Sequence, residues 1–232
     1  MEILESRRTE QGRVVSTVVT EEGKKEQKEF SSVRCGLALA TPTAAGYWIV
    51  LGQEHRGGTR FEGQVPEPGK ILFLAEHLSP SMFFPHILDS LTDAAARYHF
   101  SEVFLDYDQE EKRKVDEVSF LNALIYEKRM AMPLSFSTAP FYKDFFFGIG
   151  IINSFLEGGL LVLPDHCLVR EQLKNLQRTD LAPGEGGTKF QALNALRFAI
   201  GAFYKFRSVS GTFTPRRGRT GPDYKGRRPG RF

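Results

Sequence analysis

The sequence predicts an α/β fold: a mixed β-sheet flanked by helices, with a charged N-terminal arm and a disordered basic C-terminal tail. Three observations lead to this. The composition is globular, with 41% hydrophobic and 12% aromatic residues in a chain of 232, enough for a sizeable core. Apolar stretches typical of strands alternate with apolar spacing typical of helices between residues 33 and 206. Finally, residues 205–232 hold nine Lys/Arg and one Asp, against 22 Lys/Arg and 27 Asp/Glu in the rest.

Residues 1–32 are charged and polar around one short apolar alternation at 13–19. We expect this arm to be poorly packed or to lean on a partner. Its first residues, MEILESRRTEQGR, contain no apolar run typical of a secretory signal. Glycines and polar residues interrupt the apolar stretch 145–163, so we expect no membrane span. A cytoplasmic chain with two reduced, buried thiols, Cys35 and Cys167, is the expectation.

The first strands are expected at 33–40, 47–53 and 70–77, separated by turn and loop signals rich in Gly and Pro. They form an antiparallel meander. Apolar residues from Ile87 to Ala95 keep helical spacing, so a helix should cross over to a fourth strand at 101–108. Because crossovers of this kind are right-handed and join parallel strands, the fourth strand should lie parallel to the first.

Further elements continue the alternation. The pattern predicts short strands at 133–137 and 159–163, and helices at 115–129, 141–157, 166–177 and 189–206. The aromatic residues at 141–147 are interpreted as core packing or, alternatively, as a partner surface. From residue 208 the chain is low in apolar residues and rich in Arg, Gly and Pro, and we expect it to be disordered alone.

This order of elements is ribonuclease H-like, and residues 33–206 resemble the C-terminal nuclease domain of the large terminase subunit of tailed phages. Four stretches carry the resemblance: RCGLALATPTAAGYWIVLGQE, SEVFLDYD, FLEGGLLVLPDHCLVREQLKNLQ and FQALNALRFAIGAF. The resemblance implies a viral DNA-packaging protein that binds double-stranded DNA in the host cytoplasm. The Gly-rich stretches at 55–60 and 186–189 do not match the phosphate-binding motif of packaging ATPases. A separate packaging ATPase or portal would therefore be the partner of this chain.

In that family two divalent ions, Mg²⁺ or Mn²⁺, are held by carboxylates from the first strand, the fourth strand and the closing helix. Asp106 matches the fourth-strand position, with Asp108 on the same strand face. The resemblance therefore makes Asp106 the metal ligand and Asp106 and Asp108 the catalytic candidates. The other matching positions carry no carboxylate: Ala40 or Thr41, and Phe190, Gln191 and Asn194.

One carboxylate cannot neutralise two dications, so we expect a degenerate site with weak or absent metal binding and crippled cleavage. Two alternatives remain open. In the first, the chain is an active metal-dependent endonuclease whose missing ligands come from Glu76, Asp108 or other residues. In the second, it is a protein-interaction scaffold whose tail touches RNA or an acidic partner. For Asp106 and Asp108 themselves, the alternative is that they are merely polar residues that close a strand.

Basic residues interleaved with glycine suit a flexible polycation that binds phosphates without sequence preference. The alternative is a solubilising tail. The candidate nucleic-acid-binding residues are Arg56, Arg60, Lys189, Arg216, Arg217, Arg219, Lys225, Arg227, Arg228 and Arg231.

Overall fold

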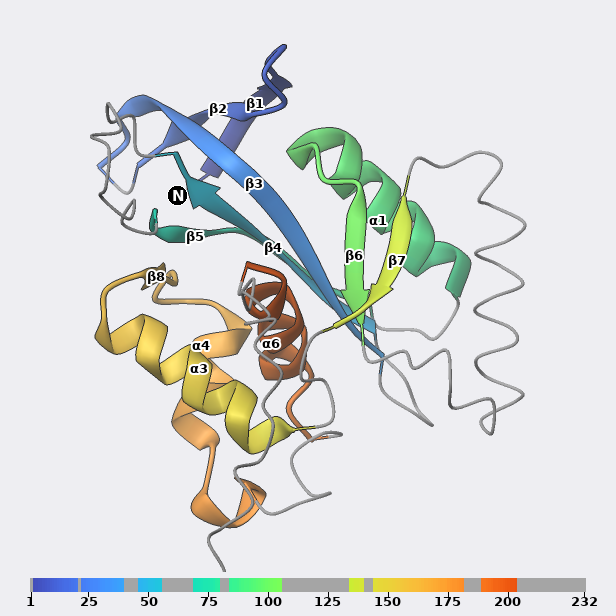
Figure 1. The fold of residues 1–232 in the computed structure, drawn as a ribbon, viewed down its shortest axis with the longest axis vertical. Coiled ribbons are helices and arrows are strands. Elements are labelled where there is room, and N and C mark those ends of the chain that lie inside the picture. Colours follow the sequence, from blue (N-terminus) through green and yellow to red (C-terminus); the bar gives the residue numbers. More distant parts are fainter. Residues whose placement is uncertain are drawn as a thin grey trace, which may run out of the picture.

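A computed structural model of the chain describes residues 2–20, 22–39, 46–55, 69–79, 84–105, 134–139, 144–181 and 189–203. Within these residues the fold is mixed α/β, with a mostly antiparallel sheet and four α-helices (Figure 1). The predicted helix at 115–129 lies outside the described residues.

The strands are β1 (Glu2–Arg8), β2 (Val14–Val19), β3 (Lys25–Leu39), β4 (Gly46–Glu54), β5 (Ile71–Ser79), β6 (Glu102–Leu105), β7 (Ser135–Thr138) and β8 (Leu161–Val162). The helices are α1 (Phe84–Tyr98), α3 (Phe145–Glu157), α4 (Leu168–Asn175) and α6 (Gln191–Phe203), with a short 3-10 helix at Arg178–Leu181.

The sheet runs in the order β1-β2-β3-β4-β5-β8, and β6 and β7 extend it beside the C-terminal half of β3. β3, β4 and β5 are antiparallel neighbours, which confirms the predicted meander. β6 pairs parallel to β3, with Cys35 opposite Val103, as the crossover argument predicted. β7 lies parallel to β6, and β8 lies parallel to β5 at the other edge.

The expectation of a poorly packed N-terminal arm is wrong. β1, β2 and the first half of β3 form an antiparallel extension of the sheet. Their inward side chains, Ile3, Val14, Val18 and Phe30, are buried in the core cluster that α1 covers. The physical reason is a period-two apolar pattern hidden among charges, since a strand needs only every second residue to be apolar. Tight turns join these strands at Gly12 and Gly23, whose φ angles of 77° and 76° favour glycine.

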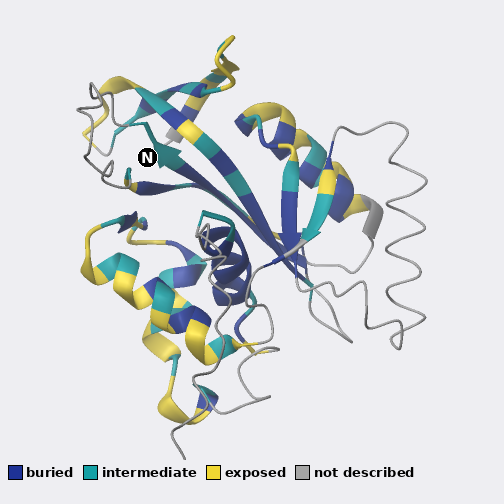
Figure 2. Cartoon of the chain, viewed as in Figure 1, coloured by how far each residue is buried: buried dark blue, intermediate teal, exposed yellow. Residues whose placement is uncertain are grey.

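Two cores lie on opposite faces of the sheet. α1 covers the face that carries Val33, Cys35 and Leu37, and α6 covers the other. α3 and α4 pack outside α6, so every residue of α6 from Ala192 to Gly201 is buried (Figure 2). A helix buried all round is a packing element of the interior.

The helix that was expected to start at residue 141 begins at Phe145. Asp144 caps it, since its carboxylate accepts a hydrogen bond from the Phe147 N–H at 2.8 Å. Phe146 and Phe147 in its first turn are exposed, which leaves the partner-surface interpretation of this aromatic run open.

Both cysteines are buried free thiols, as expected. Each helix in the described part of the chain is too short or too polar to span a bilayer.

Candidate functional site

The candidate site lies at the sheet edge where β3 and β6 end. Asp106 and Asp108 follow directly after β6 and lie outside the described residues, as do Ala40 and Thr41 after β3. The same holds for the candidate DNA contacts Arg56, Arg60, Arg216, Arg217, Arg219, Lys225, Arg227, Arg228 and Arg231. The last described residues of the two strands are Leu39 and Leu105, which pack in the core cluster that α1 covers.

α6 lies tightly against the sheet because β3 has a glycine beneath it. A Cβ placed on Gly36 would lie 2.0 Å from the Ala195 carbonyl oxygen and 2.8 Å from the Ala199 nitrogen. Only a residue without a side chain allows this approach. α6 contains neither Asp nor Glu, so it brings no carboxylate to the sheet edge.

Asn194 of α6 is buried and is joined to the α6–α3 interface through Arg197. Asn194 and Arg197 are 4% and 5% exposed, and the Arg197 Nη2 donates to the Asn194 Oδ1 at 2.8 Å. The Arg197 side chain packs on Gly148 of α3, where an added Cβ would lie 1.9 Å from the Arg197 Cδ. Its guanidinium also lies over the rings of Phe145 and Phe198, 5.4 and 5.0 Å from their centroids. The Asn194 amide oxygen therefore already has a partner within the protein.

The other two positions that match the family's metal ligands, Phe190 and Gln191, carry no carboxylate either. Phe190, just before the helix, is buried and stacks on Phe145 with 6.3 Å between ring centroids. Gln191, at the first position of the helix, is half-buried. Gln172 of α4 caps this end, since its Oε1 accepts from the Leu193 N–H at 3.2 Å.

Glu76, the acid that sequence reasoning offered as a substitute ligand, has structural partners. Its carboxylate accepts a hydrogen bond from the Tyr47 hydroxyl and another, at 3.1 Å, from the Leu168 N–H that opens α4. Cys167, the N-cap of that helix, makes no side-chain capping bond, so Glu76 caps α4 from a strand. Burial, and then the bond to Glu76, raise the pKa of Tyr47, which keeps its hydroxyl protonated.

Glu76 also lies far from the end of β6. β3 and β4 stand between β5 and β6, and three strand spacings amount to roughly 14 Å. Two metal ions in a nuclease site lie only about 4 Å apart. Glu76 cannot complete a two-metal site at the end of β6.

Lys189, a candidate DNA contact, is paired within the protein. Its Nζ lies 2.8 Å from the Asp180 Oδ1, and Asp180 also accepts from the Gln177 N–H. The Lys189 ammonium and the Gln177 N–H together lower the pKa of Asp180.

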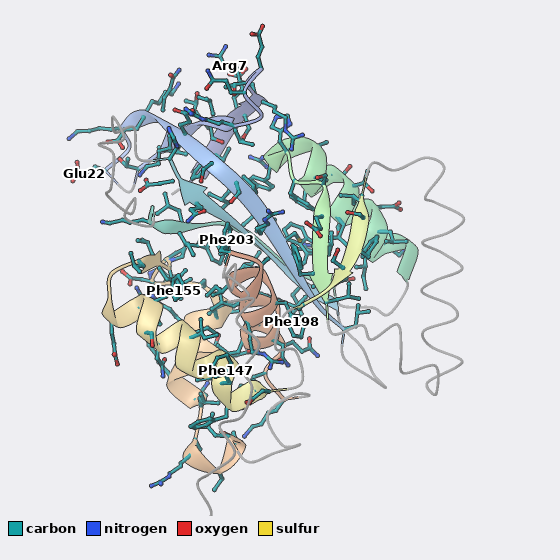
Figure 3. All side chains as sticks on the ribbon, in the orientation of Figure 1. Arg7, Glu22, Phe147, Phe155, Phe198 and Phe203 are labelled. Carbon is teal, nitrogen blue, oxygen red and sulfur yellow. The ribbon has the colours of Figure 1, made fainter. Side chains whose placement is uncertain are left out.

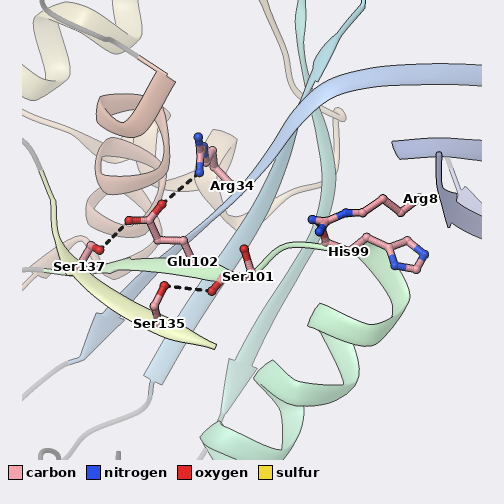
Figure 4. A network of polar contacts seen from close by, with 7 residues as sticks. All are labelled: Arg8, Arg34, His99, Ser101, Glu102, Ser135 and Ser137. Atoms are coloured by element: carbon pink, nitrogen blue, oxygen red, sulfur yellow. Dashed lines mark hydrogen bonds and ion pairs between the residues drawn. The ribbon is translucent and has the colours of Figure 1, made fainter. Parts of the chain in front are cut away.

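A polar network that sequence reasoning missed crosses β3, β6 and β7. The Arg34 Nη1 lies 3.1 Å from the Glu102 Oε2, and the Ser137 hydroxyl donates to the Glu102 Oε1 at 2.6 Å (Figure 4). The Arg34 guanidinium also lies 5.8 Å from the centroid of the Phe104 ring. The sequence carries a signal for this network: Arg34 alternates with the apolar residues Val33, Cys35 and Leu37, so it lies on the other face of the strand.

Within the described residues, no three His, Cys, Asp or Glu side chains converge as a metal site would require. No protein-family model and no curated protein matches the chain. Among solved structures it is similar to the large terminase nuclease from thermophilic phage G20c with bound zinc, at 10% sequence identity and a TM-score of 0.43. That similarity covers 84% of this chain and 92% of the other.

Proposed function

We propose that the chain is a double-stranded DNA-binding protein with a ribonuclease H-like domain of the terminase nuclease type, whose two-metal site is degenerate. The observation that carries the proposal is α6, a buried helix without a carboxylate that packs across β3 and against α3. The strand arrangement agrees with the expectation behind it, because β3, β4 and β5 form a meander and β6 lies parallel beside β3.

Catalysis by two ions needs carboxylates to hold both close together, one ion activating water and the other stabilising the leaving oxygen. α6 offers Asn194 and Gln191, whose neutral amides are weaker ligands for Mg²⁺ or Mn²⁺ than carboxylates. The Asn194 amide oxygen is already bonded to a buried guanidinium, which repels a cation. Asp106 alone would hold at most one largely hydrated ion.

DNA binding is assigned to the basic residues that follow α6. A segment of this composition neutralises phosphates and releases their counterions, which gives affinity without sequence preference. Residues 1–204 have an excess of acidic residues, so binding depends on that segment. In this role the chain is a clamp or positioning module beside a separate packaging ATPase or portal, in the cytoplasm of an infected cell.

The test is a binding titration on a blunt duplex at several salt concentrations, with the full chain and a full-length variant. In the variant, glutamine replaces Arg216, Arg217, Arg219, Arg227, Arg228 and Arg231. We expect the variant to bind the duplex at least tenfold more weakly at low salt and to show a shallower dependence on salt. Equal affinity of the two chains would contradict the assignment of DNA binding to this segment.

A further inference from the structure

A second site lies at the opposite end of the α6 face of the sheet. It is a cavity of about 740 Å³, of the size that holds small ligands in proteins. Ser32 in this cavity and Leu39 at the candidate metal edge are seven residues apart on β3, roughly 23 Å for an extended strand. The lining residues come from β3, β4, β5, α3 and α6, together with residues just before β5 and β8.

The floor of the cavity is polar. Ser32 of β3 and Gln53 of β4 are register partners, and Arg34 lies two residues further along the same strand face. Within the described residues, the Ser32 hydroxyl and the Gln53 side-chain NH₂ make no hydrogen bond. The Arg34 Nε is also unpaired there, but it is buried and is not offered to a ligand. The Arg34 side chain is 27% exposed, and only its Nη1 contacts Glu102. Hydrogen-bonding groups on this floor therefore remain available to a ligand.

The walls of the cavity are apolar and partly aromatic. Phe155 of α3 and Phe203 at the end of α6 both line it, and Figure 3 labels the two side chains. Leu160 and Ala202 also line this side of the cavity. A flat, apolar ligand body fits such walls, because aromatic rings favour offset or edge-to-face contact with another ring.

The charge of the floor argues against a strongly anionic ligand. Glu102 balances the Arg34 charge at 3.1 Å, so the floor carries no net charge. A ligand that matches it has a neutral, planar body with donors and acceptors along one edge. A nucleobase has this chemistry, and Arg and Gln side chains are common partners of base edges.

The sequence that follows the cavity residue Phe203 also supports a nucleic-acid ligand. Phe203, which lines the cavity, is followed in sequence by the basic segment that starts with Lys205 and Arg207. Only Tyr204 separates Phe203 from Lys205 in the sequence, so a nucleic acid bound by Lys205 would be close to the cavity along the chain.

We propose that this cavity holds one unpaired nucleobase of a DNA end or gap, stacked against Phe203 with its edge on Ser32, Arg34 and Gln53. The inference rests on the proposed DNA binding and adds a preference for single-stranded positions. Base stacking on an aromatic side chain supplies the affinity, and the polar floor orients the base.

The experiment compares a blunt duplex with the same duplex carrying a short overhang that contains the fluorescent base 2-aminopurine. We expect the overhang to raise the affinity of the wild-type chain about tenfold, as one stacked base does, and to change the probe's emission. Phe203→Ala and Gln53→Ala should remove most of this preference while duplex affinity stays within about twofold. Phe146→Ala and Gln27→Ala are the matched controls, because both side chains are exposed and neither lines the cavity.

The inference is overturned if the wild-type chain shows no preference for the overhang, or if Phe203→Ala and Gln53→Ala retain it. It is also overturned if these two variants weaken both DNAs equally. If the wild-type chain binds neither DNA, the proposed function fails, and the cavity is tested alone by NMR titration with a millimolar, uncharged deoxynucleoside. A shift of the Gln53 side-chain amide signals then supports the cavity site, and no shift overturns it. Circular dichroism confirms that each variant is folded.

Discussion

The Arg197 guanidinium donates to the Asn194 amide oxygen across one turn of α6, with 2.8 Å between Nη2 and Oδ1, and both residues are buried. A buried cation paired with a neutral amide is the opposite of the carboxylate cluster that two divalent ions need. Through Arg197, which packs on Gly148, this pair is joined to the interface between α6 and α3.

Gly148→Ala tests that interface. The added methyl group would lie 1.9 Å from the Arg197 Cδ, so the side chain must shift. We expect the free energy of unfolding to fall by about 1–3 kcal/mol, the usual cost of overpacking. Gly150→Ala is the matched control in the same helix, because its Cβ would meet no atom within 4 Å. That variant should be neutral or up to about 1 kcal/mol more stable. Urea unfolding measures both, and equal values would show that Arg197 does not fill this interface.

Gly36→Ala tests the contact between α6 and β3. The new methyl group would meet backbone atoms of Ala195 and Ala199, which cannot rotate away as a side chain can. We expect a loss of at least about 3 kcal/mol, or a chain that does not fold, since the helix must move off the sheet. The check is the urea midpoint of unfolding. A variant as stable as the wild type would mean that α6 lies further from β3 than these distances require.

Stability should fall at alkaline pH. Burial raises the pKa of the Cys35 thiol and of the Tyr47 hydroxyl. The folded chain therefore keeps protons that the unfolded chain releases above roughly pH 8.5 for the thiol and pH 10 for the phenol. The stabilisation is complete below these values and is lost as pH rises, by up to about 1.4 kcal/mol per pH unit for each group.

Unfolding in urea with a reductant, measured from pH 8 to 10.5, checks this dependence. Cys35→Ala should show a shallower loss of stability between pH 8.5 and 10 than the wild type. Identical slopes would mean that the folded protein lets Cys35 ionise as readily as the unfolded chain does.

Lys189→Gln tests whether Lys189, a candidate DNA contact from the sequence, binds phosphate. Because the Lys189 ammonium is paired with Asp180, this substitution should leave the slope of log affinity against log salt almost unchanged. Neutralising the six tail arginines should reduce that slope by roughly 0.9 for each phosphate that the tail no longer neutralises. A fall of about one unit for Lys189→Gln alone would make Lys189 a direct phosphate ligand.

The sheet was largely predictable from the sequence, and the reasons are local. Alternation and turn signals placed β4 and β5 within one or two residues. The packing of residues 2–30 was missed because Val14 and Val18 alternate with polar residues in a charged segment, so composition hid the strand period.

The site was less predictable, because side-chain roles depend on contacts between distant segments. In the sequence, Glu76 was interpreted as an acid at a strand edge that is available to bind a metal. In the structure its partners are Tyr47 of another strand and Leu168 of a helix that follows 92 residues later. The amides of α6 were visible in the sequence, but the link from Asn194 through Arg197 to α3 depends on how the two helices pack. The prediction that Asp106 is the surviving ligand position lies outside the described residues and stays a prediction.

The most direct test of the central claim is a cleavage assay on supercoiled plasmid with Mg²⁺ and with Mn²⁺, using the wild-type chain and Asp106→Ala. The account predicts that the two chains leave the plasmid equally intact at concentrations where the wild-type chain binds it. Robust nicking or linearisation by the wild-type chain that disappears in Asp106→Ala would contradict it.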